Sequence, residues 1–136
     1  MSVKTYNPKK VTCALGSHNV TGFADDSMIT VDYAGDGTSY VEGADGEVVR
    51  SIDPSSIYTV KITVQQTSKT NAFLRSQYAK DQTDGNGIFP ITIKDILGSE
   101  KFSASAAWVT KPASWVRGKT QNNLEWELVA TGGSIS

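Results

Sequence analysis

The sequence IYTVKITVQQ, at Ile57–Gln66, alternates apolar and polar side chains from Tyr58 to Gln65. In an extended chain, neighbouring side chains point to opposite faces. One face would carry Tyr58, Val60, Ile62 and Val64, and the other Thr59, Lys61, Thr63 and Gln65. The pattern predicts a β-strand with one face on the core and the other toward water or a polar neighbour.

Shorter runs on both sides of this segment predict further strands. Val11–Leu15 and Met28–Tyr33 are β-prone and bounded by Gly, Asp and Ser. Phe89–Ile93 alternates as well, and Pro90 within it predicts an edge strand or a bulge. Two later runs place Phe102, Ala104, Ala106 and Trp108 on one face, and then Leu124, Trp126 and Leu128, with Glu125 and Glu127 opposite.

One helix follows the central strand. An apolar stripe of Ala72, Phe73, Leu74, Tyr78 and Ala79 predicts it, and Ser68, Thr70 or Asn71 can cap its N-terminus. We therefore predict a mainly β fold, an antiparallel β-barrel or sandwich with one flanking α-helix, as a single domain over residues 1–136. The predicted core consists of Val60, Ile62, Val64, Phe73, Phe89, Phe102, Trp108 and Trp126.

Charge is distributed unevenly along the chain. Between Asp25 and Asp53 there are eight acids and one base, or −7, and the remainder has six acids and twelve bases, or +6. The acidic stretch contains four glycines, so residues 33–51 are interpreted as a long hairpin rather than a packed core element. A self-assembling subunit could set such an acidic surface against a basic one on the next copy. A solvated acidic loop is the alternative.

Few residues suggest catalysis or metal binding. The chain has one cysteine, Cys13, and one histidine, His18, which exclude an internal disulfide and leave almost nothing for a zinc site. His18 lies in a predicted turn, Asp25-Asp26 lacks calcium-loop spacing, and no Ser has a plausible activating base. The glycine-rich segments lack the Lys-Ser/Thr of a phosphate loop. We predict no enzyme activity, no cofactor and no metal.

The composition of the chain also argues against membrane, secreted and nucleic-acid-binding proteins. No apolar run approaches the roughly 20 residues that a membrane helix needs, and Met1–Lys10 lacks the apolar centre of a secretion signal. We expect that the protein is made in the cytoplasm. We also expect that it does not insert into a membrane. The isoelectric point of about 5.7 argues against a nucleic-acid clamp, which is usually basic over its binding face.

Several segments, in order, resemble phage tail tube proteins of contractile (myovirus-type) tails. They are Thr5–Val11 (TYNPKKV), Thr21–Ala24 (TGFA), Gly43–Ser51 (GADGEVVRS), Thr63–Ser68 (TVQQTS) with Asn71, Gly85–Pro90 (GNGIFP), Ala107–Pro112 (AWVTKP) and Asn122–Trp126 (NNLEW). The likeness spans nearly the whole chain, and the Gly43–Arg50 segment discriminates best.

The resemblance implies a tail-tube or Hcp-like architecture whose subunits form stacked hexameric rings. These rings would build the tube of a virion tail, assembled in the host bacterial cytoplasm, with DNA passing through the lumen. The implied partners are the tail sheath protein, baseplate or hub proteins and a tail terminator. An acidic lumen would repel DNA and let it slide.

Two sets of residues are candidates for the implied surfaces. The inter-ring hypothesis names Tyr33, Asp36, Tyr40, Glu42, Asp45, Glu47 and Arg50. The lumen hypothesis names Asp32, Thr59, Lys61, Thr63 and Gln65. Lys61 would attract phosphate on such a wall unless Asp32 or Glu47 from an adjacent strand neutralises it.

Two alternatives remain at this point. The first is another component of the same fold, such as an Hcp-like secreted tube protein or a tube initiator or terminator. The second is a monomeric ligand-binding β-domain that uses Trp115, in the loop-like segment Lys111–Trp115, and the acidic hairpin. The copy number per particle distinguishes a tube subunit from the first alternative. Sedimentation distinguishes it from the second, because a tube subunit forms rings or tubes and the ligand-binding domain stays a monomer.

Overall fold

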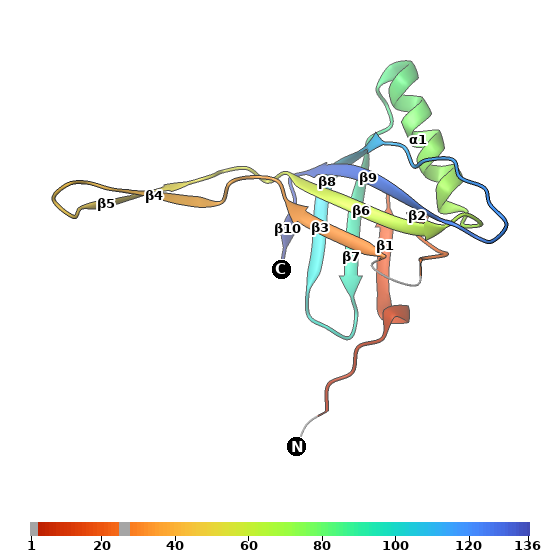
Figure 1. Cartoon of the computed structure of the whole chain (residues 1–136), viewed down its shortest axis with the longest axis horizontal. Coiled ribbons are helices and arrows are strands. Elements are labelled where there is room, and N and C mark those ends of the chain that lie inside the picture. Colours follow the sequence, from red (N-terminus) through yellow and green to blue (C-terminus); the bar gives the residue numbers. More distant parts are fainter. Residues whose placement is uncertain (1–2, 25–27) are drawn as a thin grey trace.

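Figure 1 shows a curved sheet with one helix at its side and a two-stranded ribbon that extends far from both. The computed structural model describes residues 3–24 and 28–136. After a 3-10 helix at Pro8–Lys10, the elements are β1 (Val11–Leu15), β2 (His18–Asn19), β3 (Ile29–Tyr33), β4 (Thr38–Glu42), β5 (Val48–Ile52), β6 (Tyr58–Gln65), α1 (Thr70–Asp84), β7 (Phe89–Asp95), β8 (Lys101–Lys111), β9 (Asn123–Thr131) and β10 (Ser134–Ile135).

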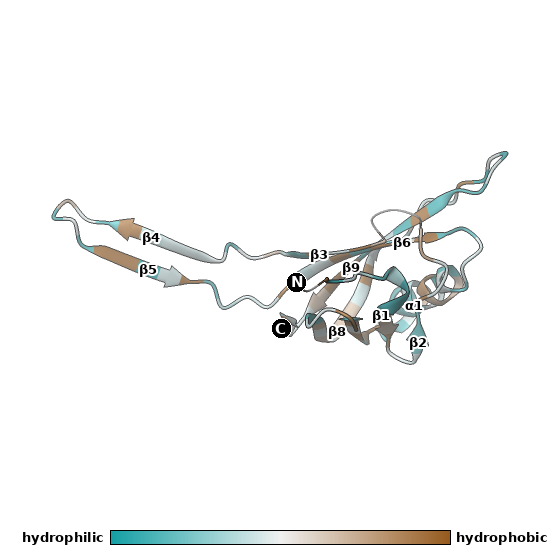
Figure 2. Ribbon diagram, turned by 90° about the horizontal axis from the view of Figure 1, so that it is seen from below, coloured by the Kyte–Doolittle hydropathy of each residue, from teal (hydrophilic) through white to brown (hydrophobic). Residues whose placement is uncertain are grey.

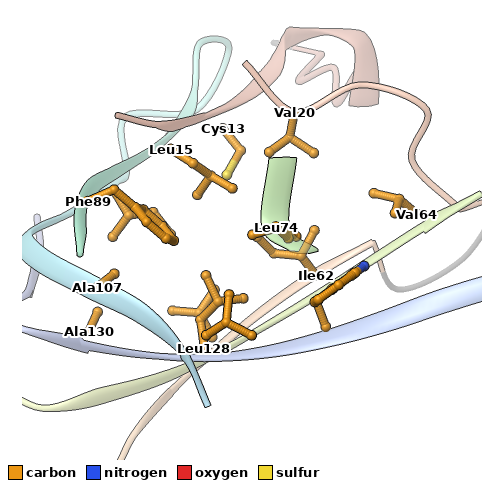
Figure 3. Close-up of a cluster of buried hydrophobic side chains, with 14 of the residues drawn as sticks. Cys13, Leu15, Val20, Ile62, Val64, Leu74, Phe89, Ala107, Leu128 and Ala130 are labelled. Atoms are coloured by element: carbon orange, nitrogen blue, oxygen red, sulfur yellow. The ribbon is translucent and has the colours of Figure 1, made fainter. Parts of the chain in front are cut away.

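The main sheet is antiparallel, with the order β2-β1-β7-β8-β9-β6-β3 and with β10 added to β8. Strands from distant places in this order share one core, because Cys13 and Leu15 of β1 are buried in the same cluster as Val60 and Ile62 of β6. Figure 3 shows Cys13, Leu15 and Ile62 converging, together with Leu74 of α1. The sheet therefore curves around its own apolar face, which confirms the predicted mainly β architecture with a flanking helix.

The strand predictions are confirmed closely where alternation is regular. The structure has β1 at the predicted residues and β6 within one residue of the predicted ends. Pro90 does not mark an edge, because β7 lies between β1 and β8. The register between β7 and β8 does shift between Phe89 and Ile91, so the bulge was the correct alternative.

The prediction that Trp108 belongs to the core is wrong, and the same bulge explains why. From the pair Ile91–Ala104 to the pair Phe89–Ala107, β7 advances by two residues but β8 by three. One additional residue moves all later side chains of a strand to the opposite face. Ala107 and Val109 are consequently buried, whereas Ala106 and Trp108 are only half-buried. The other predicted core residues are buried, except for Phe73, which packs at the edge of the cluster.

The helix begins at Thr70, and of the three predicted caps only Ser68 binds a backbone amide of the first turn through its side chain. Lys69 is the N-cap residue and makes no side-chain cap bond, while the Ser68 hydroxyl accepts a 3.1 Å hydrogen bond from the Thr70 amide. Thr70 and Asn71 are buried inside the first turn rather than capping it. Leu74 is buried, but Ala72 and Ala79 of the predicted stripe are exposed. The helix thus contacts the core mainly through its first half.

Candidate assembly surfaces

The segment 34–56, here called the arm, carries β4 and β5 away from the rest of the molecule (Figures 1 and 2). The two strands pair only with each other, and every residue in both of them is exposed. An isolated two-stranded hairpin is at best marginally stable in water. Within the residues that the structure describes, the two strands of the arm have no third strand beside them.

The base of the arm is held by Asp53. Its carboxylate accepts hydrogen bonds from the amides of Asp36 (2.7 Å) and Ser55 (2.9 Å), and its own amide donates to the Gly37 carbonyl (2.9 Å). The bonds from Ser55 and Asp36 lower the pKa of Asp53 below its usual range. A Cβ atom on Gly35 would lie 2.5 Å from the Asp53 carboxylate, so a larger residue there would displace this carboxylate. These contacts fix where the arm leaves the sheet.

The tip of the arm is a tight acidic turn. The Gly43 amide donates to the Glu47 carbonyl (2.7 Å), and Gly46 has a φ of +88°, a conformation that favours glycine. Asp45 accepts a 3.1 Å bond from the Glu47 amide within this turn. Five acids and one base give residues 34–56 a charge of −4.

The structure places six of the seven inter-ring candidates on the arm. Tyr40, Glu42 and Arg50 lie on its strands, Asp45 and Glu47 form the tip, and Asp36 lies at the base. Tyr33 instead ends β3, where its hydroxyl donates to the Ser55 carbonyl (2.9 Å). Tyr33 is therefore placed to support the base of the arm.

The lumen candidates share a second surface, here called the outer face, on the side of β3, β6 and β9 that points away from the core. Because Val60 and Ile62 point inward, Thr59, Lys61, Thr63 and Gln65 point outward. Asp32 lies opposite Thr59 in the register of β3 and β6. The structure thus brings all five sequence-predicted residues onto one surface.

The outer face contains two acids that the lumen hypothesis did not include. In the register of β6 and β9, Glu127 lies opposite Lys61 and Glu125 opposite Thr63. The expected partner Glu47 is at the tip of the arm, far from Lys61 (Figure 1), and Asp32 is diagonal to Lys61. With Asp32, Glu125 and Glu127 against Lys61, the outer face has a charge of −2. The alternation of both glutamates with Leu124, Trp126 and Leu128 was the signal that could have assigned them.

A basic loop lies at the end of the molecule opposite the arm (Figures 1 and 2). This end loop comprises Lys111, the last residue of β8, and residues 112–122 that lead to β9, and it contains Lys111, Arg117 and Lys119 but no acid. Trp115 is 67% exposed there, and the Arg117 guanidinium stacks 4.2 Å from the centre of its ring. One end of the molecule therefore combines acidic with exposed apolar side chains, and the other end combines basic with exposed apolar side chains.

The remaining candidates for chemistry have structural roles. His18 Nε2 is 3.0 Å from the Thr70 hydroxyl, and its ring stacks on Phe73, which joins β2 to α1. Burial lowers the pKa of His18 and raises that of the Cys13 thiol to about 12. Asp25 and Asp26 lie outside the described residues.

Over 3–24 and 28–136, no group of three or more His, Cys, Asp or Glu side chains is arranged to hold a metal ion. In the same part of the chain, no helix combines the length and apolar character that crossing a membrane would require.

Solved structures that resemble this chain come from contractile injection systems. A tube-terminating cap of the anti-feeding prophage matches with a TM-score of 0.67 and 15% identity, over 100% of this chain and 94% of that one. The sheath/tube terminator of the extracellular injection system PVC matches with a TM-score of 0.68 and 13% identity, over 100% and 99%. A chain of the PVC sheath-tube complex gives 0.61 and 14%, over 97% and 91%. These likenesses confirm the tube-type fold.

Sequence comparisons agree with the fold. "Structural protein ORF10" of Pseudomonas phage KPP10 is 25% identical over 135 residues, covering 93% of this chain and 78% of that protein. The sequence model of the bacteriophage PhiTE tail tube protein family matches residues 8–135. The chain therefore belongs to the PhiTE tail tube protein family and is a structural component of a phage tail rather than an enzyme.

Proposed function

We propose that this chain assembles into stacked hexameric rings that form the inner tube of a contractile tail, through which DNA passes during ejection. The observation that carries this proposal is the arm, a ribbon whose two strands pair only with each other and hold large apolar side chains in water. A monomer gains no stability from such an element, whereas a polymer can bury it. Rings would form in the host bacterial cytoplasm before they enter the virion.

Stacking is assigned to the arm and the end loop because they lie at opposite ends of the long axis. A contact between two different surfaces of the same chain is heterologous, and repetition of it generates rings or open filaments. The charge of −4 on the arm and the lysines and arginine of the end loop are complementary. Each ring would then present acidic arms on one side and basic loops on the other.

The lumen is assigned to the outer face. Its polar residues and net negative charge suit a wall past which a polyanion must slide without binding. Screening limits an exposed charge to about 8 Å at physiological salt, so residues on the wall itself dominate this effect. Lys61 lies opposite Glu127, which offsets its attraction for phosphate.

The partners follow from the tube assignment. The PVC structures named above contain a sheath-tube complex and a sheath/tube terminator. By analogy, we expect the outer surface of the tube to contact a tail sheath protein, and its ends to contact baseplate or hub proteins and a terminator.

Electron microscopy of the purified full chain tests the proposal directly. The wild type should form tubes of stacked rings. In a deletion variant, an Asn-Gly turn replaces residues 38–52 and joins Gly37 to Asp53, which are already hydrogen bonded (2.9 Å). This variant should fold but remain as unstacked rings or monomers, because it lacks the strands of the arm. A concentrated wild type that stays a monomer and binds glycans through Trp115 would instead support the ligand-binding alternative.

A tube terminator is the second candidate, favoured by the two terminator structures with TM-scores of 0.67 and 0.68. A terminator caps a tube once, whereas a tube subunit repeats along it. Quantitative mass spectrometry of purified phage particles separates the two. A copy number of one ring per tail would contradict the tube proposal.

A further inference from the structure

The edge strand β2 contacts the start of α1 through His18. The Nε2 atom of His18 lies 3.0 Å from the hydroxyl oxygen of Thr70. The imidazole ring also stacks on Phe73, with 4.6 Å between the ring centres and 10° between the ring planes. Within the sheet, β2 pairs with Ala14 and Leu15 of β1. Because this pairing is so short, the contact with α1 is a large part of what holds β2 in place.

The segment that follows β2 is held by the same hydroxyl group. The Thr70 hydroxyl oxygen accepts a 3.3 Å hydrogen bond from the Thr21 amide. The Ser68 hydroxyl donates to the Thr21 carbonyl and accepts a 3.1 Å bond from the Thr70 amide. Thr70 is fully buried, so water does not replace these partners. The four residues His18, Thr21, Ser68 and Thr70, here called the joint, connect the β1–β2 hairpin to α1.

The hydrogen bonds of the joint determine which proton His18 carries. A hydroxyl group donates one hydrogen bond and accepts up to two. The Thr70 hydroxyl accepts from the Thr21 amide, and among the described residues Nε2 of His18 is the one acceptor within reach of its proton. The ring is then neutral, with its own proton on Nδ1. In the imidazolium form both ring nitrogens are donors, which would leave the buried hydroxyl proton without an acceptor.

Burial lowers the pKa of His18 below its ordinary value of about 6.5. The other titratable residues on the described elements packed against His18 are Cys13 on β1, Lys69, Arg75, Tyr78, Lys80, Asp81 and Asp84 on or beside α1, and Lys94 and Asp95 on β7. None of them contributes to the shift in this pKa. Arg75 lies over the ring of Trp126 (5.2 Å), and Asp81 accepts a 2.8 Å bond from the Gly87 amide. The response of His18 to pH therefore depends on the joint itself.

We propose that His18 is a pH-sensitive switch, which holds the β1–β2 hairpin on α1 while it is neutral and releases the hairpin when it is protonated. Asn71 keeps α1 on β9 through its 2.9 Å bond from Trp126, so the release is confined to the joint. The ring of Phe73 and the edge of the sheet then become accessible to other chains. Because the folded-state pKa is lowered, the stabilisation is complete above about pH 6.5 and is lost as the pH falls from there through that pKa.

Nuclear magnetic resonance of the unassembled full-length chain tests the protonation state. His18 is the single histidine, so nitrogen labelling of histidine reports on this ring alone. At pH 7.5 we expect a proton on Nδ1 and an Nε2 atom that accepts a hydrogen bond. The ring should titrate below pH 6.5. A proton on Nε2 at pH 7.5, or titration at or above pH 6.5, would overturn the proposal.

Amide hydrogen exchange measures the release itself. Protection factors, corrected for the intrinsic pH dependence of exchange, should fall about tenfold at Thr21 and Thr70 between pH 7.5 and pH 5. Val60, in the centre of the sheet, should keep its protection. In His18→Gln, the side-chain oxygen can accept the Thr70 bond but does not titrate, so the pH dependence should disappear at both amides.

Three exchange results would contradict the switch. They are an unchanged protection of Thr21 and Thr70 in the wild type, the same fall in His18→Gln, and an equal loss at Val60, which would mean that acid unfolds the whole domain. If His18→Gln does not fold, the position of the proton in the wild type still decides the proposal. Neither measurement requires assembly, so both are independent of the proposed tube function.

Discussion

The indole nitrogen of Trp126 donates a 2.9 Å hydrogen bond to Oδ1 of Asn71, which joins the centre of the sheet to the first turn of the helix. Trp126 is fully buried, and Asn71 is 7% exposed. The side-chain nitrogen of Asn71, Nδ2, lies 3.0–3.2 Å from the backbone carbonyl oxygens of Gln65, Gln66 and Ser68. One side chain therefore satisfies the buried indole and the chain segment that leads into α1.

We expect Asn71→Leu to destabilise the subunit by about 1–3 kcal/mol, because Trp126 would keep a buried donor without an acceptor. Urea denaturation of the unassembled protein measures this loss. Ser76→Ala, at an exposed position on the same helix, is the control and should change the unfolding free energy little. Equal stabilities of the two variants would show that the Asn71 contacts add nothing.

Two tryptophans of the same sheet should respond differently to truncation. Trp126→Ala should cost about 3–5 kcal/mol, because it removes a fully buried ring from the core. Trp108→Ala should cost only about 1 kcal/mol, because the β8 bulge turns this half-buried ring away from the core. Melting temperatures of the two variants check the order. A larger loss at Trp108 would contradict the observed register.

Exchanging charges between the arm and the end loop tests their contact. Glu47→Lys or Lys119→Glu alone should raise the concentration needed for tube formation by about twofold to fivefold, since exposed ion pairs contribute about 0.2–1 kcal/mol. The double variant should recover part of the loss, and the effects should shrink as salt rises. Lys80→Glu, an exposed position on α1, makes the same charge change away from the loop. Sedimentation gives the critical concentrations, and an additive double variant would exclude direct coupling.

Neutralising the outer face should affect DNA movement rather than assembly. A variant with Asp32→Asn, Glu125→Gln and Glu127→Gln changes the charge of this surface from −2 to +1, which leaves Lys61 unopposed. Phage that carries it should still build tails of normal length but eject DNA more slowly, especially at low salt. Adding Lys61→Gln should restore part of the ejection rate. Unchanged ejection with normal tails would place the lumen elsewhere.

The base of the arm should loosen in acid. Asp53 has a folded-state pKa below its ordinary value of about 4, so its ionised form stabilises the arm base above that value. As pH falls through the lowered pKa, protonation weakens the bonds from the Ser55 and Asp36 amides, and this stabilisation is lost. Amide hydrogen exchange at these two positions reports the change. Asp53→Asn should show faster exchange at neutral pH and no further acid transition there.

Much of the fold could be predicted because β6 and β9 have regular alternation, which depends only on local side-chain order. The place of Trp108 could not, because the bulge in β8 arises from pairing with Phe89 and Ile91, which are distant in sequence. The long hairpin was predictable from its glycines and charges. Its separation from the main sheet was not, since the same pattern suits a hairpin packed on a core.

The candidate surfaces also combine features that the sequence could predict with features that depend on how the strands pair. All five predicted lumen residues share the outer face, because β6 itself defines which side points outward. The neighbour of Lys61 had to be seen in the structure, where Glu127 replaces the expected Glu47. Strand order, rather than any single-strand pattern, decides which charges meet across a sheet.

The separation of the arm from the core has an evolutionary consequence. No residue of β4 or β5 belongs to the buried cluster, so substitutions there leave the folding of the subunit almost untouched. If the arm is the stacking surface proposed above, selection can change which subunits are compatible without risking misfolded protein. Two phages that infect one cell could keep their tails from co-polymerising by divergence in these few exposed positions alone.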